Sequence, residues 1–219
     1  MRDNFEKQLQ KLDNSLSEFG EILSKCIEYS NKAISLDSLN DAKACLQYES
    51  DIYVYDSVVE GRSIKLIMKE QPVAKDLRYI SSSLKMVTDM RRIGRQTIDI
   101  SEIVERRINL GGSFKIFDDL ISLGEETEKI VTRAIECRKS GDTSLVEDII
   151  KSDDYVDDYF SKVKDKVKDF FNNEEIDKEL IIDVIMIAKY FERIADHAVN
   201  IADWVYYSIE GEHIYKKNL

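Results

Sequence analysis

Four oxygen-bearing side chains recur along one face of the helical stretch near the end of the chain. They are Glu192, Asp196, Asn200 and Asp203. At 100° per residue, the four fall within about 80° of one another on an α-helix. Apolar residues share that side of the helix, which indicates that the face points into the protein. Buried carboxylates are destabilising unless a positive charge meets them, so the pattern favours a bound metal cation.

A second acidic pair lies on the preceding helical stretch. Asp153 and Asp157 share the i, i+4 spacing of Glu192 and Asp196, so each pair projects from one face of its helix. Apolar residues flank Asp153 and Asp157 as well. Two such pairs on antiparallel neighbours would form a cage of hard oxygen ligands for iron, manganese, magnesium, calcium or zinc. From the residues alone, one alternative is that these acids form a solvated face of each helix. Another is that Arg193 neutralises a carboxylate, although Arg193 should project from a different face than Glu192.

Constellations typical of catalysis are scarce. The chain has only two histidines, His197 and His213, and His197 lies about 140° round the helix from Glu192. A bundle-type di-iron oxidase needs Glu-x-x-His on two helices, and that motif is absent. No Ser-His-Asp or Cys-His set and no Gly-rich phosphate loop is evident. We therefore expect no enzyme, with a carboxylate-bridged metalloenzyme as the less favoured alternative, and a packing or partner-contact role for His197.

Composition bounds the class of protein. The chain has 219 residues, of which 43% are hydrophobic, and its single Pro and eight Gly favour helices over a turn-rich β-sandwich. The net charge of −11 argues against nucleic acid and anionic membrane surfaces. No apolar run approaches the ~18–20 residues that span a bilayer, and the N-terminus lacks a signal-peptide core. Cys26, Cys45 and Cys137 are expected to be reduced core thiols in a cytoplasmic protein.

Six long helices are predicted, separated by short breaks at proline, glycine and polar residues. Their approximate ranges are 3–35, 38–69, 72–109, 114–139, 143–171 and 175–209. The order in the first half recurs in the second. Residues 90–93 align with residues 191–194 at an offset of 101, and Glu49 aligns with Asp153 at an offset of 104. The sequence thus predicts an all-α protein of two pseudo-symmetric three-helix bundles, residues 1–110 and 113–219.

Three segments carry a family resemblance: residues 71–78, which begin Gln71-Pro72, residues 191–201, and the ending at residues 206–211. They resemble the PhoU family, whose members regulate phosphate uptake. The first is similar to that family's turn into its third helix, and the second to its Glu-Arg-Ile-Gly-Asp-x-x-x-Asn-Ile signature. The likeness covers nearly the whole chain, including the duplicated three-helix order.

The resemblance implies a cytoplasmic, non-catalytic, negative regulator of phosphate uptake and phosphate-response signalling. The implied partners are the ATPase subunit of a phosphate ABC transporter, a membrane sensor histidine kinase and a second copy of the chain, without nucleic acid or direct membrane insertion. Iron or zinc is the implied metal, with magnesium, manganese, calcium and nickel left open. The alternative is a PhoU-fold regulator of a different transporter or channel. The predicted ligands are Asp153, Asp157, Glu192, Asp196, Asn200 and Asp203.

The first half departs from the family pattern. The family's Glu and Asp of the third helix are Arg91 and Arg95 here, and the second Asp of its second helix is Tyr53. Guanidinium groups repel cations, so we expect the first metal site to be lost and the second to be kept. Arg91 and Arg95 are expected to enter a salt-bridge network in its place, or to bind an anion such as phosphate. The acids available to that network are Glu49, Asp99 and Glu102.

Overall fold

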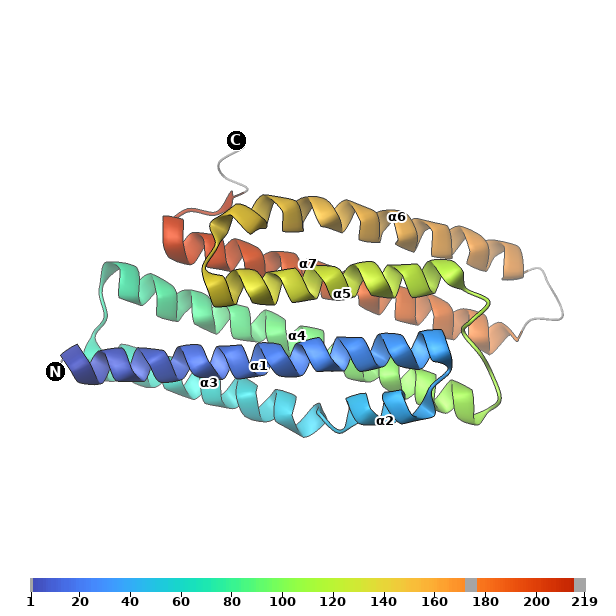
Figure 1. Ribbon diagram of the computed structural model, residues 1–219, viewed down its shortest axis with the longest axis horizontal. Helices are drawn as coiled ribbons and strands as arrows, with labels where there is room; N and C mark the ends of the chain where they lie inside the picture. The colour runs from blue at the N-terminus through green and yellow to red at the C-terminus, as the bar shows by residue number, and fades with distance from the viewer. Residues whose placement is uncertain (1, 172–176, 215–219) are drawn as a thin grey trace.

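The prediction of an all-α protein is confirmed. The computed structural model describes residues 2–171 and 177–214, and within these ranges it holds α-helices, one short 3₁₀ helix and no strand. Figure 1 shows the long helices lying lengthwise side by side, with α1–α4 on one side of the bundle and α5–α7 on the other. The elements are α1 (Arg2–Leu36), α2 (Leu39–Leu46), α3 (Glu49–Glu70), α4 (Ala74–Asn109), α5 (Asp118–Ser140), η1 (Thr143–Leu145), α6 (Val146–Phe171) and α7 (Lys178–Glu210).

The predicted single helix over residues 38–69 is wrong in one respect, because it is divided into α2 and α3. Ser38 caps α2 by accepting a hydrogen bond from the Asp41 amide at 3.3 Å. At Tyr48 the amide donates to the Cys45 carbonyl at 3.0 Å, which is three residues back instead of four. This tighter bond interrupts the α-helical ladder. The Tyr48 ring also stacks on Tyr29 of α1, with centroids 6.4 Å apart.

The connection between α5 and α6 also differs from the predicted uninterrupted helix starting at residue 143. Gly141 ends α5 with φ 68, a left-handed conformation that glycine adopts without steric strain. Asp142 then accepts a hydrogen bond from the Ser144 amide at 3.0 Å and caps the 3₁₀ helix η1. The helix proper, α6, begins at Val146 and carries Asp153 and Asp157 along its middle turns.

The two sides of the bundle are joined mainly along α4 and α7. Buried apolar side chains from both sides form one continuous cluster. A buried ion pair crosses the junction, where Arg107 Nε donates to Asp183 Oδ2 at 2.9 Å. Arg106 Nη2 contacts the other oxygen of Asp183 at 2.5 Å. The division into residues 1–110 and 113–219 stays a prediction.

Two further expectations from composition can be compared with the structure. Cys26, Cys45 and Cys137 are buried and free, as predicted. In the part of the chain that the structure describes, no helix combines the length and the apolar character that crossing a membrane requires.

Candidate metal centre

Four of the six predicted ligands come together between α6 and α7. Asp153 and Asp157 lie one turn apart on α6, and Glu192 and Asp196 lie one turn apart on α7. The helices α6 and α7 pack against each other, and Asp153 lies close enough to Glu192 and Asp196 to experience their charges. We call these four residues the α6–α7 carboxylate cluster.

Loss of hydration and mutual repulsion within the cluster raise the pKa values of two of its members, Asp153 and Asp196. Burial, followed by the negative charges of Asp196 and Asp157, raises the pKa of Asp153 to about 6. The charge of Glu192 acts in the same direction on Asp153. Partial loss of hydration, followed by the negative charge of Glu192, likewise raises the pKa of Asp196, although part of its side chain stays in contact with solvent. Asp153 and Asp196 therefore experience the negative charge of the neighbouring acids, and gathering the four carboxylates is unfavourable without a compensating positive charge.

One side-chain cation reaches the cluster. Lys189 Nζ contacts both carboxylate oxygens of Glu192 at 2.6 Å, and it also lies 5.4 Å from the ring centroid of Phe160. The positive charge of Lys189 lowers the pKa of Asp196 in opposition to the larger raising effects. Within residues 2–171 and 177–214, no ion pair forms at Asp153, Asp157 or Asp196. Lys189 thus compensates one of four negative charges.

The expectation that the α7 face points into the protein is wrong for most of its length. Asp196 and Asn200 are exposed, Glu192 is half-buried, and Asp157 on α6 is also exposed. The reason is that α6 covers α7 only partly, so the acids line a seam between the two helices that opens to solvent. Apolar residues on the same side of a helix do not by themselves place a neighbouring carboxylate inside the core.

Asp203 is buried, but it is engaged elsewhere. Its Oδ2 bonds to His213 Nδ1 at 2.5 Å, and its Oδ1 accepts a hydrogen bond from the Ile214 amide at 3.0 Å. These contacts hold the segment after α7 against the helix, where Trp204 packs edge-on to the His213 ring. The structure therefore does not bring Asp203 or the exposed Asn200 into the α6–α7 carboxylate cluster.

As a donor set, the cluster fits a hard cation. Carboxylate oxygens are the ligands that magnesium, manganese, calcium and iron accept, and the excess negative charge gives a cation a reason to bind. In the described residues, however, no three His, Cys, Asp or Glu side chains stand in ligating geometry. The metal site stays a prediction, with Asp153, Asp157, Glu192 and Asp196 as its plausible ligands.

The equivalent position in the first half is closed by internal ion pairs. Arg95 Nη1 lies 2.8 Å from Glu49 Oε1 on α3, and Arg95 Nη2 lies 2.9 Å from Asp99 on α4. Both contacts were among those expected from the sequence. Arg91 instead pairs with Asp56, at 3.3 Å between Nε and Oδ2, a partner that sequence reasoning missed. Two guanidiniums thus stand where the second half has carboxylates.

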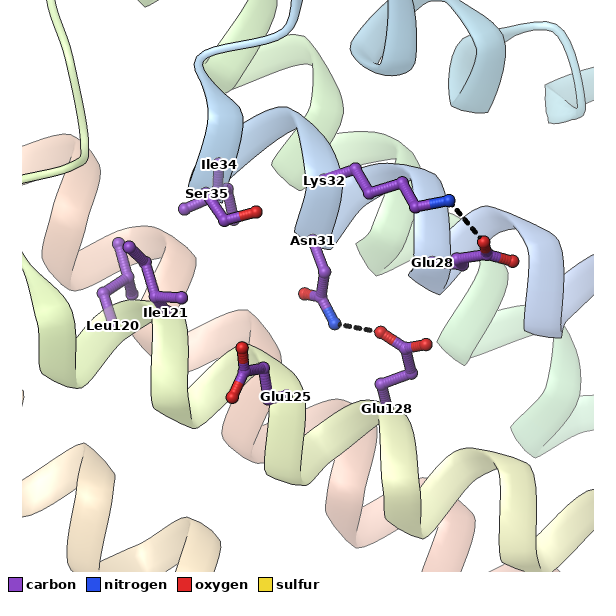
Figure 2. A pocket seen from close by; sticks show the side chains of 9 residues that line it. All are labelled: Glu28, Asn31, Lys32, Ile34, Ser35, Leu120, Ile121, Glu125 and Glu128. Atoms are coloured by element: carbon purple, nitrogen blue, oxygen red, sulfur yellow. Dashed lines mark hydrogen bonds and ion pairs between the residues drawn. The ribbon is translucent and has the colours of Figure 1, made fainter.

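A second acidic hollow, of about 280 Å³, lies between α1 and α5 (Figure 2). Its carboxylates come from Glu28, Glu125 and Glu128. Lys32 Nζ contacts Glu28 at 2.5 Å, and Asn31 Nδ2 donates to Glu128 at 2.7 Å, as Figure 2 shows. Two of its three carboxylates are therefore already engaged within the protein, which distinguishes this hollow from the α6–α7 carboxylate cluster.

His197 has the packing role that the sequence suggested. The ring is buried where α4 meets α7, and its Nδ1 lies 2.8 Å from Asp89 Oδ1 of α4. The sequence offered no signal for Asp89 as its partner, because the two residues are far apart in the chain. The histidine thus connects the two sides of the bundle next to the cluster without belonging to it.

The chain is similar to a known protein family and to several named proteins along almost its whole length. The family model described as the PhoU domain matches twice, over residues 16–104 and 120–205. A phosphate-specific transport system accessory protein PhoU homolog of Clostridium acetobutylicum is 24% identical over 214 residues, which cover 97% of each chain. The phosphate-specific transport system accessory protein PhoU homolog 1 of Thermotoga maritima is 29% identical over 218 residues. The match covers 96% of this chain and 91% of the Thermotoga protein.

Solved structures show the same fold. The crystal structure of PhoU from Pseudomonas aeruginosa superposes with a TM-score of 0.90 at 22% identity, covering 95% of this chain and 100% of the other. The phosphate transport system regulatory protein PhoU from Streptococcus pneumoniae gives a TM-score of 0.82 at 17% identity, with 96% and 99% covered. At these identities the likeness establishes the arrangement of helices alone.

Proposed function

The chain belongs to the PhoU family, and from this premise we propose that it is a cytoplasmic regulatory adaptor of phosphate uptake and phosphate-response signalling. The observation that carries the proposal is the double match of the PhoU domain model, once in each half of the chain. The named relatives are accessory proteins of phosphate-specific transport and align along almost their whole lengths. No part of the proposal requires catalysis.

In this role the protein restrains its partners through contact. We propose the ATPase subunit of a phosphate ABC transporter and a membrane sensor histidine kinase as those partners, with the protein acting as a homodimer. One observation favours a second candidate, a regulator of a different transporter or channel. Arg91 and Arg95 replace the acids expected in the first half, so the surface around them differs in charge from the family pattern.

A deletion strain separates the two candidates. Loss of the protein is expected to leave phosphate-starvation genes expressed in phosphate-rich medium, and the intact coding sequence is expected to restore repression. Affinity purification of the tagged protein from the same strain should recover the phosphate transporter's ATPase subunit. Normal repression in the deletion strain, together with recovery of an unrelated transporter, would contradict the phosphate role and favour the second candidate.

We further propose that the α6–α7 carboxylate cluster responds to metal. Asp153 on α6 experiences the negative charges of Glu192 and Asp196 on α7, and this repulsion opposes the packing of the two helices. Lys189 offsets part of this repulsion through Glu192. A bound di- or trivalent cation would supply the missing positive charge and tie α6 to α7. The occupied and vacant states would then offer partners a different outer surface.

Hydrogen exchange tests this coupling directly. Chelation is expected to speed amide exchange along α6 and along α7 around Glu192, while α1 and α3 keep their protection. The first half serves as the internal control, because Arg95 and Glu49 close the equivalent position without metal. Equal protection of α6 and α7 before and after chelation would show that a metal does not set the shape of this surface.

A further inference from the structure

A cluster of positively charged side chains lies between α1 and α3, in a hollow separate from the α6–α7 carboxylate cluster. It lines a hollow of about 400 Å³, with Lys11 on α1 and Arg62, Lys65 and Lys69 on α3. We call these four residues and the space between them the α1–α3 basic hollow. The two helices lie side by side and belong to the first half of the chain (Figure 1).

The cations of this hollow have no carboxylate partners. Among the described residues, none of the four forms an ion pair, although the protein carries 43 acidic and 32 basic residues. Glu70 is the one carboxylate at its edge, and it accepts a hydrogen bond from Asn4 Nδ2 at 3.5 Å. In a chain with a net charge of −11, unpaired cations gathered in a concave site create a strong local positive potential.

Arg62 is fixed in place at the wall of the hollow. Its Nη1 donates to the Lys11 carbonyl oxygen of α1 at 2.5 Å and to the Ser15 hydroxyl. These bonds span from α3 to α1, so the guanidinium is oriented before any ligand arrives. Its Nη2 and Nε form no hydrogen bond to the residues that the structure describes. A pre-positioned guanidinium with unused donors suits the oxygens of a phosphoryl group.

We propose that the α1–α3 basic hollow binds a condensed phosphate group, that is, a diphosphate or triphosphate, either free or carried by a nucleotide. Three lysines and an arginine match the several negative charges of such an anion, and Gln8 adds an amide donor. The volume lies within the range of small-molecule sites and leaves room for more than one phosphoryl group. The overall negative charge disfavours a long polyanion that would extend beyond the hollow. This inference does not depend on the proposed regulatory role or on metal at α6–α7.

Isothermal titration calorimetry with sodium tripolyphosphate, at near-physiological ionic strength, tests the proposal. The unmodified protein is expected to bind, and Lys65→Gln/Lys69→Gln is expected to bind about tenfold more weakly. Lys25→Gln/Lys151→Gln is the matched control, because it removes the same charge from exposed lysines outside the hollow. A parallel titration with ATP distinguishes a nucleotide from a free phosphate chain, since a nucleotide site would bind ATP more tightly than tripolyphosphate.

Three results would overturn the proposal. The first is the absence of binding by the unmodified protein. The second is an equal loss of affinity in both lysine variants, which would indicate non-specific attraction to charge. The third is tighter binding of a glutamate-rich peptide than of tripolyphosphate, which would assign the hollow to an acidic protein surface. A rise in melting temperature with tripolyphosphate that is lost only in Lys65→Gln/Lys69→Gln would provide independent support.

Discussion

The two halves of the molecule place side chains of opposite charge at equivalent helix–helix contacts. At the joint between α3 and α4, Arg95 contacts Glu49 and Asp99 at 2.8 and 2.9 Å. At the equivalent joint between α6 and α7, Asp196 takes the place of the arginine and faces Asp153. One joint is therefore neutralised from within, whereas the other keeps an excess of negative charge. The difference suggests that the second joint is built to receive a cation from outside.

Helix spacing sharpens the contrast. At Gly94 on α4, an added Cβ would lie 2.8 Å from the Ile52 side chain of α3, so these two helices approach closely. The residue at the equivalent place on α7 is Ala195, which carries the methyl group that Gly94 lacks. The first joint is thus tightly packed as well as neutralised. We infer that this side of the bundle holds its shape without a ligand.

Reversing the charge at the neutralised joint should have the largest effect. Arg95→Asp would remove two ion pairs and place a third carboxylate beside Glu49 and Asp99. We expect the free energy of unfolding to fall by about 2 kcal/mol, measured by urea denaturation. Arg92→Asp is the matched control, because Arg92 is exposed on the same helix and forms no ion pair within the described part of the chain. Equal losses in the two variants would refute the importance of the bridge.

The converse substitution should stabilise the second joint. Asp196→Arg copies the first half by placing a guanidinium near Asp153 and Asp157, so the metal-free protein should gain about 1 kcal/mol of stability. Asp158→Arg makes the same change of charge at an exposed position of α6 outside the cluster. Urea denaturation in the presence of a chelator measures both. A similar gain in both variants would mean that net charge, and not the cluster, determines the effect.

A change of pH should reveal a further difference in stability between the two joints. The pKa of Asp153 is about 6 in the folded protein, above its ordinary value of 3.8, so folding favours its protonated form. Deprotonation of Asp153 should therefore reduce the stability of the metal-free protein as the pH rises from about 4 to 7. The share of that loss due to Asp153 is about 1 kcal/mol after allowance for solvent screening. Comparing Asp153→Asn with the unmodified protein over this range isolates it, and parallel pH profiles would contradict it.

The periodicity of apolar residues predicted most of the helices, whereas contacts between residues far apart in the chain could not be predicted from it. Periodicity located the long helices, and the offset between halves placed Glu49 over Asp153 and Arg95 over Asp196. The division between α2 and α3 was missed, because no proline or glycine marks Tyr48. Asp203 was assigned to the cluster because angle alone was considered, while its actual partner is His213 in the segment after α7.

The charged contacts of the core show the same limit. Arg107 and Asp183 form a buried pair across the α4–α7 junction, yet in the sequence each resembles an ordinary surface residue. Lys189 was likewise not identified as the cation beside Glu192, although it lies three residues away on the same helix. An i, i+3 pair of opposite charge is a signal that could have revealed it. Which face of a helix meets solvent depends on its neighbours, and that information is absent from a single periodic pattern.

The central claim is that a cation completes the α6–α7 carboxylate cluster. Elemental analysis of freshly purified protein tests it most directly, with Glu192→Ala/Asp196→Ala as the disrupted variant and Glu49→Ala/Asp99→Ala as the control from the first half. We predict stoichiometric metal in the unmodified protein and the control, and its loss in the disrupted variant. Metal-free protein after supplementation, or equal metal in all three, would contradict the claim.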